Sequence, residues 1–416
     1  MAFLFMKNKF IKYLITSLVI AFSFWFYFQI DTYPYKVARW FQPLEAGVVS
    51  VTATHCSPNN SWLSLFVKHA VHNQGAYSAQ AVFLDPQAYL SACEIGYKKR
   101  LFSTPVGTEH RYRFASTSKL VTASAIFNLV HQNKISLDDR LVDFFPELAH
   151  FQDERVRLIT IAQLLDHAAG FNRLTLNGDP MFLRRNKPWC PNNFRELERL
   201  RLAFDPGEKQ VYSNLGFCLL GEVIHRVTGE GYHDYVEHQF SLSKRNIKFI
   251  NDFYSDDEVR YDFRYEEWFN NSYLKLFDFD ALSPVAGLSG SASALAQLLW
   301  DIHHDHAGSP FRLKKSSPEC NLKKVDGCLS LGVNHYQPDP HGLMLHYHRG
   351  YLPGSSSFAA IDSFGGVTVL VMSGADRPQQ NPQNEWIRWT YNRLSLYYTL
   401  QGKLPILNSL TKTAEN

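Results

Sequence analysis

The chain has 416 residues, of which 45% are hydrophobic and 19% charged, and this composition excludes an intrinsically disordered protein. Its length suits one large composite domain or two domains. The 42 Lys and Arg residues against 39 Asp and Glu leave a formal net charge of +3 without a long basic block. We therefore expect no nucleic-acid partner.

Residues 1–30 have the pattern of a membrane anchor. Lys7, Lys9 and Lys12 precede an uncharged, aromatic-rich run at 13–30, YLITSLVIAFSFWFYFQI. A helix needs about 17–25 residues to cross a bilayer, and basic residues ahead of it favour a cytoplasmic N-terminus. We predict a single-pass signal anchor at 1–30 in the inner membrane, a tether at 31–48 and a catalytic part that faces the periplasm.

A cleavable signal peptide is the alternative interpretation of this segment. Ala21-Phe22-Ser23 has the small residues of a cleavage site. Cleavage there would leave a mature chain that begins FWFYFQI, which is a poor terminus for a soluble protein. Both interpretations place the rest of the chain outside the cytoplasm.

Strand and helix patterns lie at both ends of the remaining chain, and the middle is mostly helical. The N-terminal end shows a helix and two strand-like runs, and the C-terminal end shows a hairpin pattern and a long helix, at 61–75, 77–85, 89–98, 355–362, 366–374 and 384–400. We predict an α/β (α+β) fold in which both ends build one antiparallel sheet flanked by helices, with an all-helical region inserted between them. This domain would span 49–405, followed by a tail at 406–416.

The run YRFASTSKLVTAS places Ser116 three residues before a lysine that opens an apolar helix pattern. Residues three apart share a helix face, so Lys119 Nζ can reach Ser116 Oγ. A serine hydroxyl needs a base before it becomes nucleophilic, and lysine is such a base when burial and a helix N-terminus lower its pKa. We predict Ser116 as nucleophile and Lys119 as base, although an S-x-x-K motif alone establishes no function.

Two further short motifs follow. Tyr212 and Asn214 precede an apolar helix pattern, where a phenol could relay protons and an amide could hold a lysine and a substrate carbonyl. His348 and Gly350 lie on a strand-like run that leads into the C-terminal hairpin. A backbone N–H at this strand edge could form an oxyanion hole with the N–H at the start of the Ser116 helix. Taken singly, each motif also fits ordinary packing.

Residues 244–282 alternate acidic with aromatic side chains. We interpret this segment as an insertion or a lid over a site, because long loops inside compact domains are often functional. A solvated insertion without a role is the alternative.

Histidine-rich stretches raise the possibility of a metal site. They lie at 301–308 and around His341, His346 and His348. Neither stretch matches a known ligand spacing. We therefore expect no metal and no cofactor.

Six cysteines without a C-x-x-C motif favour disulfides in an oxidising compartment over a zinc ribbon or a redox motif. Cys320 and Cys328 flank the short polar loop NLKKVDG, and we predict a bridge between them. Cys218 lies in an apolar helix pattern, and we interpret it as a buried free thiol. The pairing of the remaining cysteines stays open.

The motifs S-x-x-K, Y-x-N and H-x-G, in this order, resemble those of the serine β-lactamase and penicillin-binding-protein superfamily, and of its class C-like branch in particular. Three longer stretches are similar to family segments: KISLDDRLVDFFPEL, ITIAQLLDHAAGF and VAGLSGSASALAQLLWDI. The resemblance covers roughly residues 60–400. It implies an antiparallel sheet with helices on both faces beside an all-helical region, with the site in the cleft between them.

The resemblance also implies roles for the residues of the first two motifs. Ser116 would be the acylated nucleophile, Lys119 its proton acceptor, and Tyr212 the general base and proton relay. Asn214 would contact a substrate amide. His167 matches a family signature residue with a structural role.

The third motif departs from the family pattern, because it reads His-Arg-Gly and not Lys-Thr-Gly. His348 would occupy the catalytic position of this motif, and the N–H of Tyr351, after Gly350, would be the second oxyanion donor. Arg349 stands where the family usually has a small residue. Its guanidinium would bind a substrate carboxylate, or would point away from His348 and pack, because side chains alternate along a strand.

The combined expectation is a membrane-anchored, exported serine hydrolase that acts through an acyl-enzyme. Its substrate would be a peptidoglycan stem peptide, another D-amino-acid amide or a small ester, as in D,D-peptidases and esterases. The departure in the third motif argues against efficient β-lactamase activity. The alternative is a catalytically weak homologue that binds cell wall or penicillin.

Overall fold

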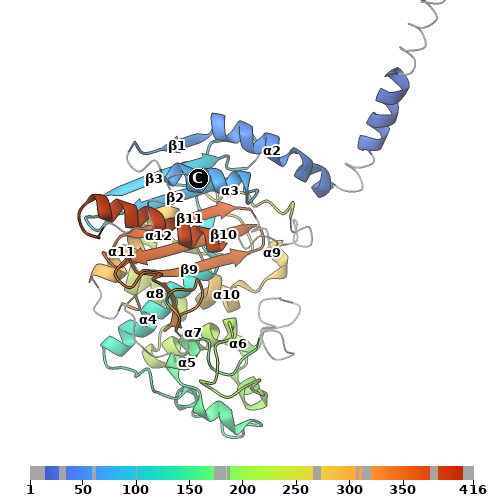
Figure 1. Ribbon diagram of the computed structural model, residues 1–416. Helices are drawn as coiled ribbons and strands as arrows, with labels where there is room; N and C mark the ends of the chain where they lie inside the picture. Colours follow the sequence, from blue (N-terminus) through green and yellow to red (C-terminus); the bar gives the residue numbers. More distant parts are fainter. Residues whose placement is uncertain are drawn as a thin grey trace, which may run out of the picture.

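A large antiparallel sheet and a mostly helical region lie side by side in the computed structural model of the protein (Figure 1). The structure describes residues 15–27, 34–58, 62–99, 101–172, 184, 188–265, 273–305, 309–311, 320–374 and 383–405. The predicted antiparallel sheet with flanking helices and an inserted helical region is confirmed.

The sheet has eight strands in the described residues, and its centre joins the two ends of the chain. All neighbouring strands are antiparallel. In spatial order they are β1 (Thr54–Cys56), β3 (Leu90–Gly96), β2 (Ser78–Leu84), β11 (Val367–Ser373), β10 (Ser355–Asp362), β9 (Leu345–Leu352), β8 (Val333–Tyr336) and β7 (Leu329–Ser330). The central pair, β2 and β11, therefore connects segments that are far apart in the sequence.

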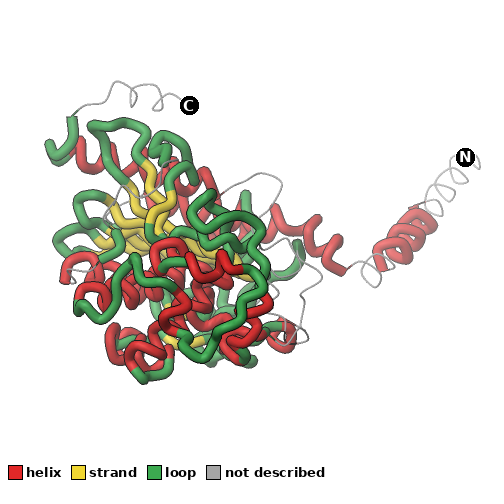
Figure 2. The backbone as a smooth tube through the Cα atoms, turned by 90° about the horizontal axis from the view of Figure 1, so that it is seen from below, coloured by secondary structure: helices red, strands yellow, loops and turns green. Residues whose placement is uncertain are grey.

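Both faces of the sheet are buried, which explains why the central strands β2, β10 and β11 are buried at every position and carry apolar residues at consecutive positions. Along β10, Phe358 and Ala360 point to one face, and Ala359 and Ile361 to the other. The first face, which we call the outer core, is covered by α3 (Trp62–His72) and α12 (Gln383–Leu400). The second, the inner core, is continuous with the helical region. Figure 2 shows the strands as a central layer between helices.

The helical region surrounds the inner core and supplies most of the site. Its main helices are α4 (Lys119–His131), α5 (Ile161–Leu165), α6 (Trp189–Asn192), α7 (Asn214–Thr228), α8 (Tyr232–Phe240), α10 (Phe279–Ala286) and α11 (Ala292–Asp305). Local signals set their ends: Thr160 and Gln163 form a capping box on α5. Gly229 ends α7 in the left-handed conformation, with φ 77°.

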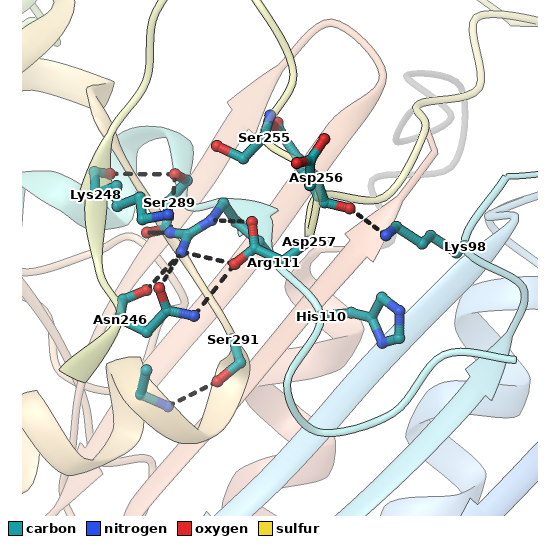
Figure 3. A network of polar contacts seen from close by, with 12 residues as sticks. Lys98, His110, Arg111, Asn246, Lys248, Ser255, Asp256, Asp257, Ser289 and Ser291 are labelled. Atoms are coloured by element: carbon teal, nitrogen blue, oxygen red, sulfur yellow. Dashed lines mark hydrogen bonds and ion pairs between the residues drawn. The ribbon is translucent and has the colours of Figure 1, made fainter. Parts of the chain in front are cut away.

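A small second sheet carries the chain into the helical region. It consists of β4 (Tyr112–Arg113), β6 (Leu288–Gly290) and β5 (Lys248–Phe249). Arg111, immediately before β4, is 1% exposed and bonds Asp257 at 2.9 Å, the Asn246 side chain at 2.7 Å and the Ser289 carbonyl at 2.7 Å (Figure 3). A buried guanidinium is tolerated only with such complete pairing. The network fixes the loop around residue 257 to this sheet.

The network also holds part of the segment 244–282, which the sequence predicts as an insertion or a lid, because Asn246 and Asp257 belong to this segment. Arg113 on β4 forms a second buried ion pair with Glu258 at 2.8 Å. The segment also contains α9 (Tyr273–Leu276) and the start of α10. Within the part of 244–282 that the structure describes, no residue lines the pocket around Ser116. Residues 266–272 lie outside the described residues, and the lid stays a prediction.

The N-terminal part consists of a helix over residues 15–27 and α2 (Pro34–Thr52). Figure 1 shows the first of these helices projecting away from the body, whereas α2 lies along it beside α3. Arg264 forms an ion pair with Glu45 at 2.7 Å and so attaches α2 to the body. In the portion of the chain that the structure describes, no helix is both long and apolar enough to span a bilayer.

All six cysteines are paired. The predicted bridge between Cys320 and Cys328 is confirmed, and a second bridge joins Cys56 on β1 to Cys93 on β3. The interpretation of Cys218 as a free thiol is wrong, because it is bonded to Cys190. The short helix α6 packs on α7 and brings Cys190 against it. A contact between segments 28 residues apart leaves no spacing signal in the sequence.

Removal of the Cys190–Cys218 bridge by a double alanine substitution should destabilise the protein. Loop-closure entropy for a separation of 28 residues corresponds to about 3.5 kcal/mol in the chain-entropy model. Chemical denaturation measures the loss. The matched control, Cys320→Ala with Cys328→Ala, opens a separation of only 8 residues and should cost about 2.5 kcal/mol. Peptide mapping that found Cys190 and Cys218 unlinked would contradict the pairing.

Candidate active site

Ser116 lies in a tight turn that the neighbouring β-strand holds in place. The turn, Ala115–Ser118, runs directly into α4, so Ser116 stands at the helix N-terminus. Ala115 has φ 50°, a left-handed conformation that is costly for a residue other than glycine. The Phe114 carbonyl accepts hydrogen bonds from Thr117 Oγ1 at 2.7 Å and from Ser357 Oγ on β10 at 2.5 Å. These bonds stabilise the turn and fix the position of Ser116.

Lys119 is completely buried, and three neutral oxygens surround its amine. Nζ lies 3.1 Å from Ser116 Oγ, 2.8 Å from Asn214 Oδ1 and 3.0 Å from the Val285 carbonyl oxygen. The apolar side of α4 explains the burial, and the oxygens of α7 and α10 replace the water that the amine has lost. Lys119 therefore connects three helices to the serine.

Tyr212 lies on the other side of Ser116, with Oη 2.9 Å from Ser116 Oγ. It immediately precedes α7 and packs on the ring of His167, with centroids 4.5 Å apart. The Ser213 N–H donates to His167 Nδ1 at 3.3 Å. Burial, and to a smaller extent the neighbouring Lys119, holds the pKa of His167 well below its usual value. A neutral His167 thus supports the backbone that positions Tyr212 and Asn214.

Gly350 permits close contact between β9 and the serine turn. A Cβ atom at this position would lie 2.4 Å from the Phe114 carbonyl oxygen and 3.0 Å from the Ser116 nitrogen. The first distance is shorter than any real contact, so only glycine fits. The backbone of β9 consequently passes directly beside the Ser116 N–H, and Tyr351 follows on the same strand.

His348 is buried on β9 beside Gly350. Burial, followed by the positive charge of Lys119, lowers the pKa of His348 to about 3. Nδ1 lies 2.7 Å from the Arg349 carbonyl oxygen, which can only accept a hydrogen bond. His348 is therefore a neutral ring that donates through Nδ1 and leaves Nε2 as an acceptor.

Arg349 lies at the mouth of the pocket and not beside His348. The register pairs it with Phe358 of the outer core, whereas His348 pairs with Ala359 of the inner core. The alternation of side chains expected along a strand is thus observed. Arg349 is nevertheless one of the residues that line the pocket, and its guanidinium forms an ion pair with Asp326, another lining residue, at 2.5 Å.

One cavity of about 630 Å³ collects the predicted residues. Ser116, Tyr212, Asn214 and the third motif from His348 to Tyr351 line it, and Lys119 lies beneath. Four other residues that line the cavity lie outside the predicted motifs: Gln210, Asp326, Leu329 and Asn334. Of these, only Asp326 carried a signal, since it lies in the loop bracketed by Cys320 and Cys328.

The histidine-rich stretches do not converge on a metal site in the described part of the chain. There, no group of three or more His, Cys, Asp or Glu residues is arranged to hold a metal ion. Residues 306–308 of the first stretch lie outside the description. His346 is buried and instead pairs with His335, with Nδ1 atoms 2.8 Å apart.

Comparison with known proteins finds relatives that match over most of the chain, and many similar folds. The chain is 32% identical over 346 residues to a putative fimbrial assembly protein FimD, serogroup D, of Dichelobacter nodosus, covering 82% of this chain and 86% of that one. A β-lactamase/D-alanine carboxypeptidase from Yersinia pestis matches with TM-score 0.60 at 16% identity, covering 76% of this chain and 92% of that chain. The D-amino acid amidase from Ochrobactrum anthropi SV3 matches with TM-score 0.62 at 17% identity, covering 81% and 99%.

A model of one protein family spans nearly the whole of the described domain. The matched residues are 63–390, and this range includes all three motifs. The family is described as beta-lactamase. The chain belongs to the beta-lactamase family.

Proposed function

We propose that this chain is a serine hydrolase that forms an acyl-enzyme at Ser116 with a peptide, amide or ester substrate. One observation carries the proposal: Ser116 Oγ lies within hydrogen-bond distance of both Lys119 Nζ and Tyr212 Oη. A nucleophile with two proton-carrying neighbours at a helix N-terminus is the arrangement that acyl transfer requires. The family assignment supports the same reaction class.

The geometry suggests how the proton moves. Ser116 Oγ attacks the substrate carbonyl carbon, and its proton passes to Lys119 in the neutral amine form. Tyr212 delivers a proton to the leaving nitrogen or oxygen as its bond to the carbonyl breaks, so that the product departs neutral. The proton that Lys119 accepted then passes to Tyr212, which returns both side chains to their starting forms. In the second half of the reaction, water adds to the acyl carbon and returns a proton to Ser116 Oγ. Asn214, which holds Lys119, would also contact a substrate amide.

Backbone donors would stabilise the tetrahedral intermediate. The Ser116 N–H is one donor in this proposal and the Tyr351 N–H is the other. The close passage of β9 at Gly350 supports this pairing. His348 would contribute a neutral acceptor in place of the cation usual in this motif.

We place this hydrolase in the inner membrane, facing the periplasm, through an N-terminal anchor. The described helix at 15–27 contains no charged residue and exposes large apolar side chains such as Phe22 and Phe24, at 61% and 75%. On α2, Trp40, Leu44 and Val51 point outward, and Trp40 stacks on Trp25 with centroids 5.7 Å apart. Both helices thus expose large apolar side chains, which is costly in water and suits a lipid interface.

Replacement of Ser116 by Ala should abolish covalent labelling by a fluorophosphonate and the turnover of a p-nitrophenyl ester. Lys119→Met, which keeps the length of the side chain without its amine, should slow acylation by about 10²–10⁴-fold because proton acceptance is lost. Intact-mass spectrometry and stopped-flow assays measure these effects.

The matched control for this experiment is Ser124→Ala. Ser124 is a buried serine of the same helix that bonds only to the Leu120 carbonyl in the described contacts. It should retain labelling. Labelling that persists on another serine after Ser116→Ala would overturn the assignment. A penicillin adduct that forms at Ser116 and never hydrolyses would favour the alternative of a weak penicillin-binding homologue.

The acidic limb of the pH profile should not depend on His348. Its pKa of about 3 keeps the ring neutral from pH 5 to pH 8, so its charge does not change in this window. The His348→Gln variant should therefore keep the apparent pKa values of kcat/KM over that range, whatever its absolute rate. A limb near pH 6.5 that is present in the native protein and absent from the variant would contradict a neutral His348.

The intact N-terminus should be found in the membrane fraction if the anchor is uncleaved. Mass spectrometry of the protein purified in detergent measures this directly. Introduction of Lys at Val19 and Phe22 should release the chain from membranes, because each charge at mid-bilayer costs about 2.5–3.5 kcal/mol. A mature protein that begins near Phe24 would show that the segment is a cleaved signal peptide.

A second candidate function is a role in fimbrial assembly, which the similarity to the Dichelobacter nodosus protein favours. Deletion of the gene should then reduce the number of fimbriae seen by electron microscopy. Complementation with the Ser116→Ala variant separates the two possibilities. Rescue would mean that assembly needs the protein without its hydrolase activity, and failure would mean that it needs the acyl-enzyme.

A further inference from the structure

An ion pair lies at the mouth of the Ser116 pocket. Arg349 extends from β9, one residue after His348, and its Nη2 is 2.5 Å from Asp326 Oδ2. Both residues line the pocket. They are partly exposed, at 23% for Arg349 and 38% for Asp326, so the pair is within reach of a substrate.

The carboxylate of this pair is held firmly in place. Asp326 has φ 58°, in a loop closed by the Cys320–Cys328 bridge and by a hydrogen bond from the Asn321 N–H to the Gly327 carbonyl. Tyr347, which is fully buried, donates its hydroxyl to Asp326 Oδ1 at 2.9 Å and accepts the Asp326 N–H at 2.8 Å. An exposed ion pair between freely rotating side chains contributes little. Here the loop and Tyr347 fix the acidic partner beforehand.

Apart from Arg349 and Asp326, no described residue that lines the pocket is an Asp, Glu, Lys or Arg. His167 and His348 are neutral because burial holds their pKa values low. Lys119 is buried beneath Ser116, and its amine faces Ser116, Asn214 and Val285. Among the described residues that line the pocket, only Arg349 and Asp326 therefore carry a full charge. The two charges have opposite signs and neutralise each other.

We propose that Asp326 masks Arg349, so that the site selects esters or amides whose leaving group carries no carboxylate. This inference rests on the proposed hydrolase function and specifies its substrate class. A substrate carboxylate that approached Arg349 would compete with the Asp326 carboxylate for the same guanidinium. It would have to displace a preorganised partner or tolerate a like charge beside it, whereas an uncharged leaving group meets neither penalty.

The inference assigns Asp326 as a specificity-determining residue for this reaction. It also gives the loop 320–328 a role, since the loop places Asp326 at the pocket. Lys323 and Lys324 of the same loop are exposed and do not line the pocket, so they offer no alternative site for a carboxylate there.

The test compares two esters that share one acyl group, one with 3-hydroxybenzoate and one with 3-hydroxybenzamide as the leaving group. The measured quantity is kcat/KM for the first divided by kcat/KM for the second. Asp326→Asn should raise this ratio by about tenfold or more, because the carboxylate that competes with the leaving group for a charge-assisted hydrogen bond to Arg349 is removed. Asp326→Ser should also raise this ratio. The second variant shows whether the increase comes from loss of the carboxylate or from the amide side chain of the Asp326→Asn variant.

The double variant Asp326→Asn with Arg349→Ala should return the ratio to the native value, because the unmasked cation is then absent. The control is Asp339→Asn, a second loop aspartate that caps a backbone N–H away from the pocket, and it should leave the ratio unchanged. The inference is wrong if Asp326→Asn leaves the ratio unchanged. It is also wrong if Arg349→Ala alone lowers the ratio, since Arg349 would then already bind carboxylates.

A binding measurement makes the test independent of catalysis. Calorimetric titration with free 3-hydroxybenzoate should show about tenfold tighter binding to Asp326→Asn than to the native chain. Equal affinity would overturn the masking. A protein that shows this difference but acylates with neither ester would instead reject the proposed hydrolase function and leave the charge masking in place.

Discussion

The buried amine of Lys119 is the interaction on which the rest of the site depends. An ammonium or amine without water needs oxygen partners on every side, and these come from the serine turn, from Asn214 on α7 and from the Val285 carbonyl at the end of α10. Three helices must therefore meet at one point. Thr122, one turn further along α4, bonds the Pro284 carbonyl at 2.6 Å and holds α4 against α10 at the same place. The helical region acts as a scaffold that keeps this cluster dry.

The sheet supplies what the helices cannot. Its strand β9 approaches the serine turn closely because Gly350 has no side chain, and Ser357 on β10 fixes the Phe114 carbonyl. The same strand carries a neutral His348 toward the inner core and a charged Arg349 toward the pocket mouth. One β-strand thus carries a neutral ring into the proposed catalytic site and a charged side chain to its entrance.

Short patterns in the sequence predicted the sheet and the main site, because each depends on local periodicity or on a fixed spacing. Ser116 and Lys119 are three residues apart, in the turn and the helix that follows it, and the strands β10 and β11 each contain four consecutive apolar residues. The partners that come from distant segments could not be predicted in this way. Cys190 reaches Cys218 only through the packing of α6 on α7, and Val285 contributes a backbone carbonyl, which has no residue signature. The only sequence signal for Asp326 was its position in the loop between Cys320 and Cys328.

The pairing of β2 with β11 has a consequence for how this protein matures. The sheet closes between residues 78–84 and 367–373. The serine turn and β9 therefore come together only after the chain has been synthesised through β11. Such long-range pairing makes folding slow. Until β9 docks against the serine turn, Ser116 lacks the strand that completes its surroundings. We expect a nascent chain to carry an inert serine during its synthesis, and to acquire a reactive one in a single late step.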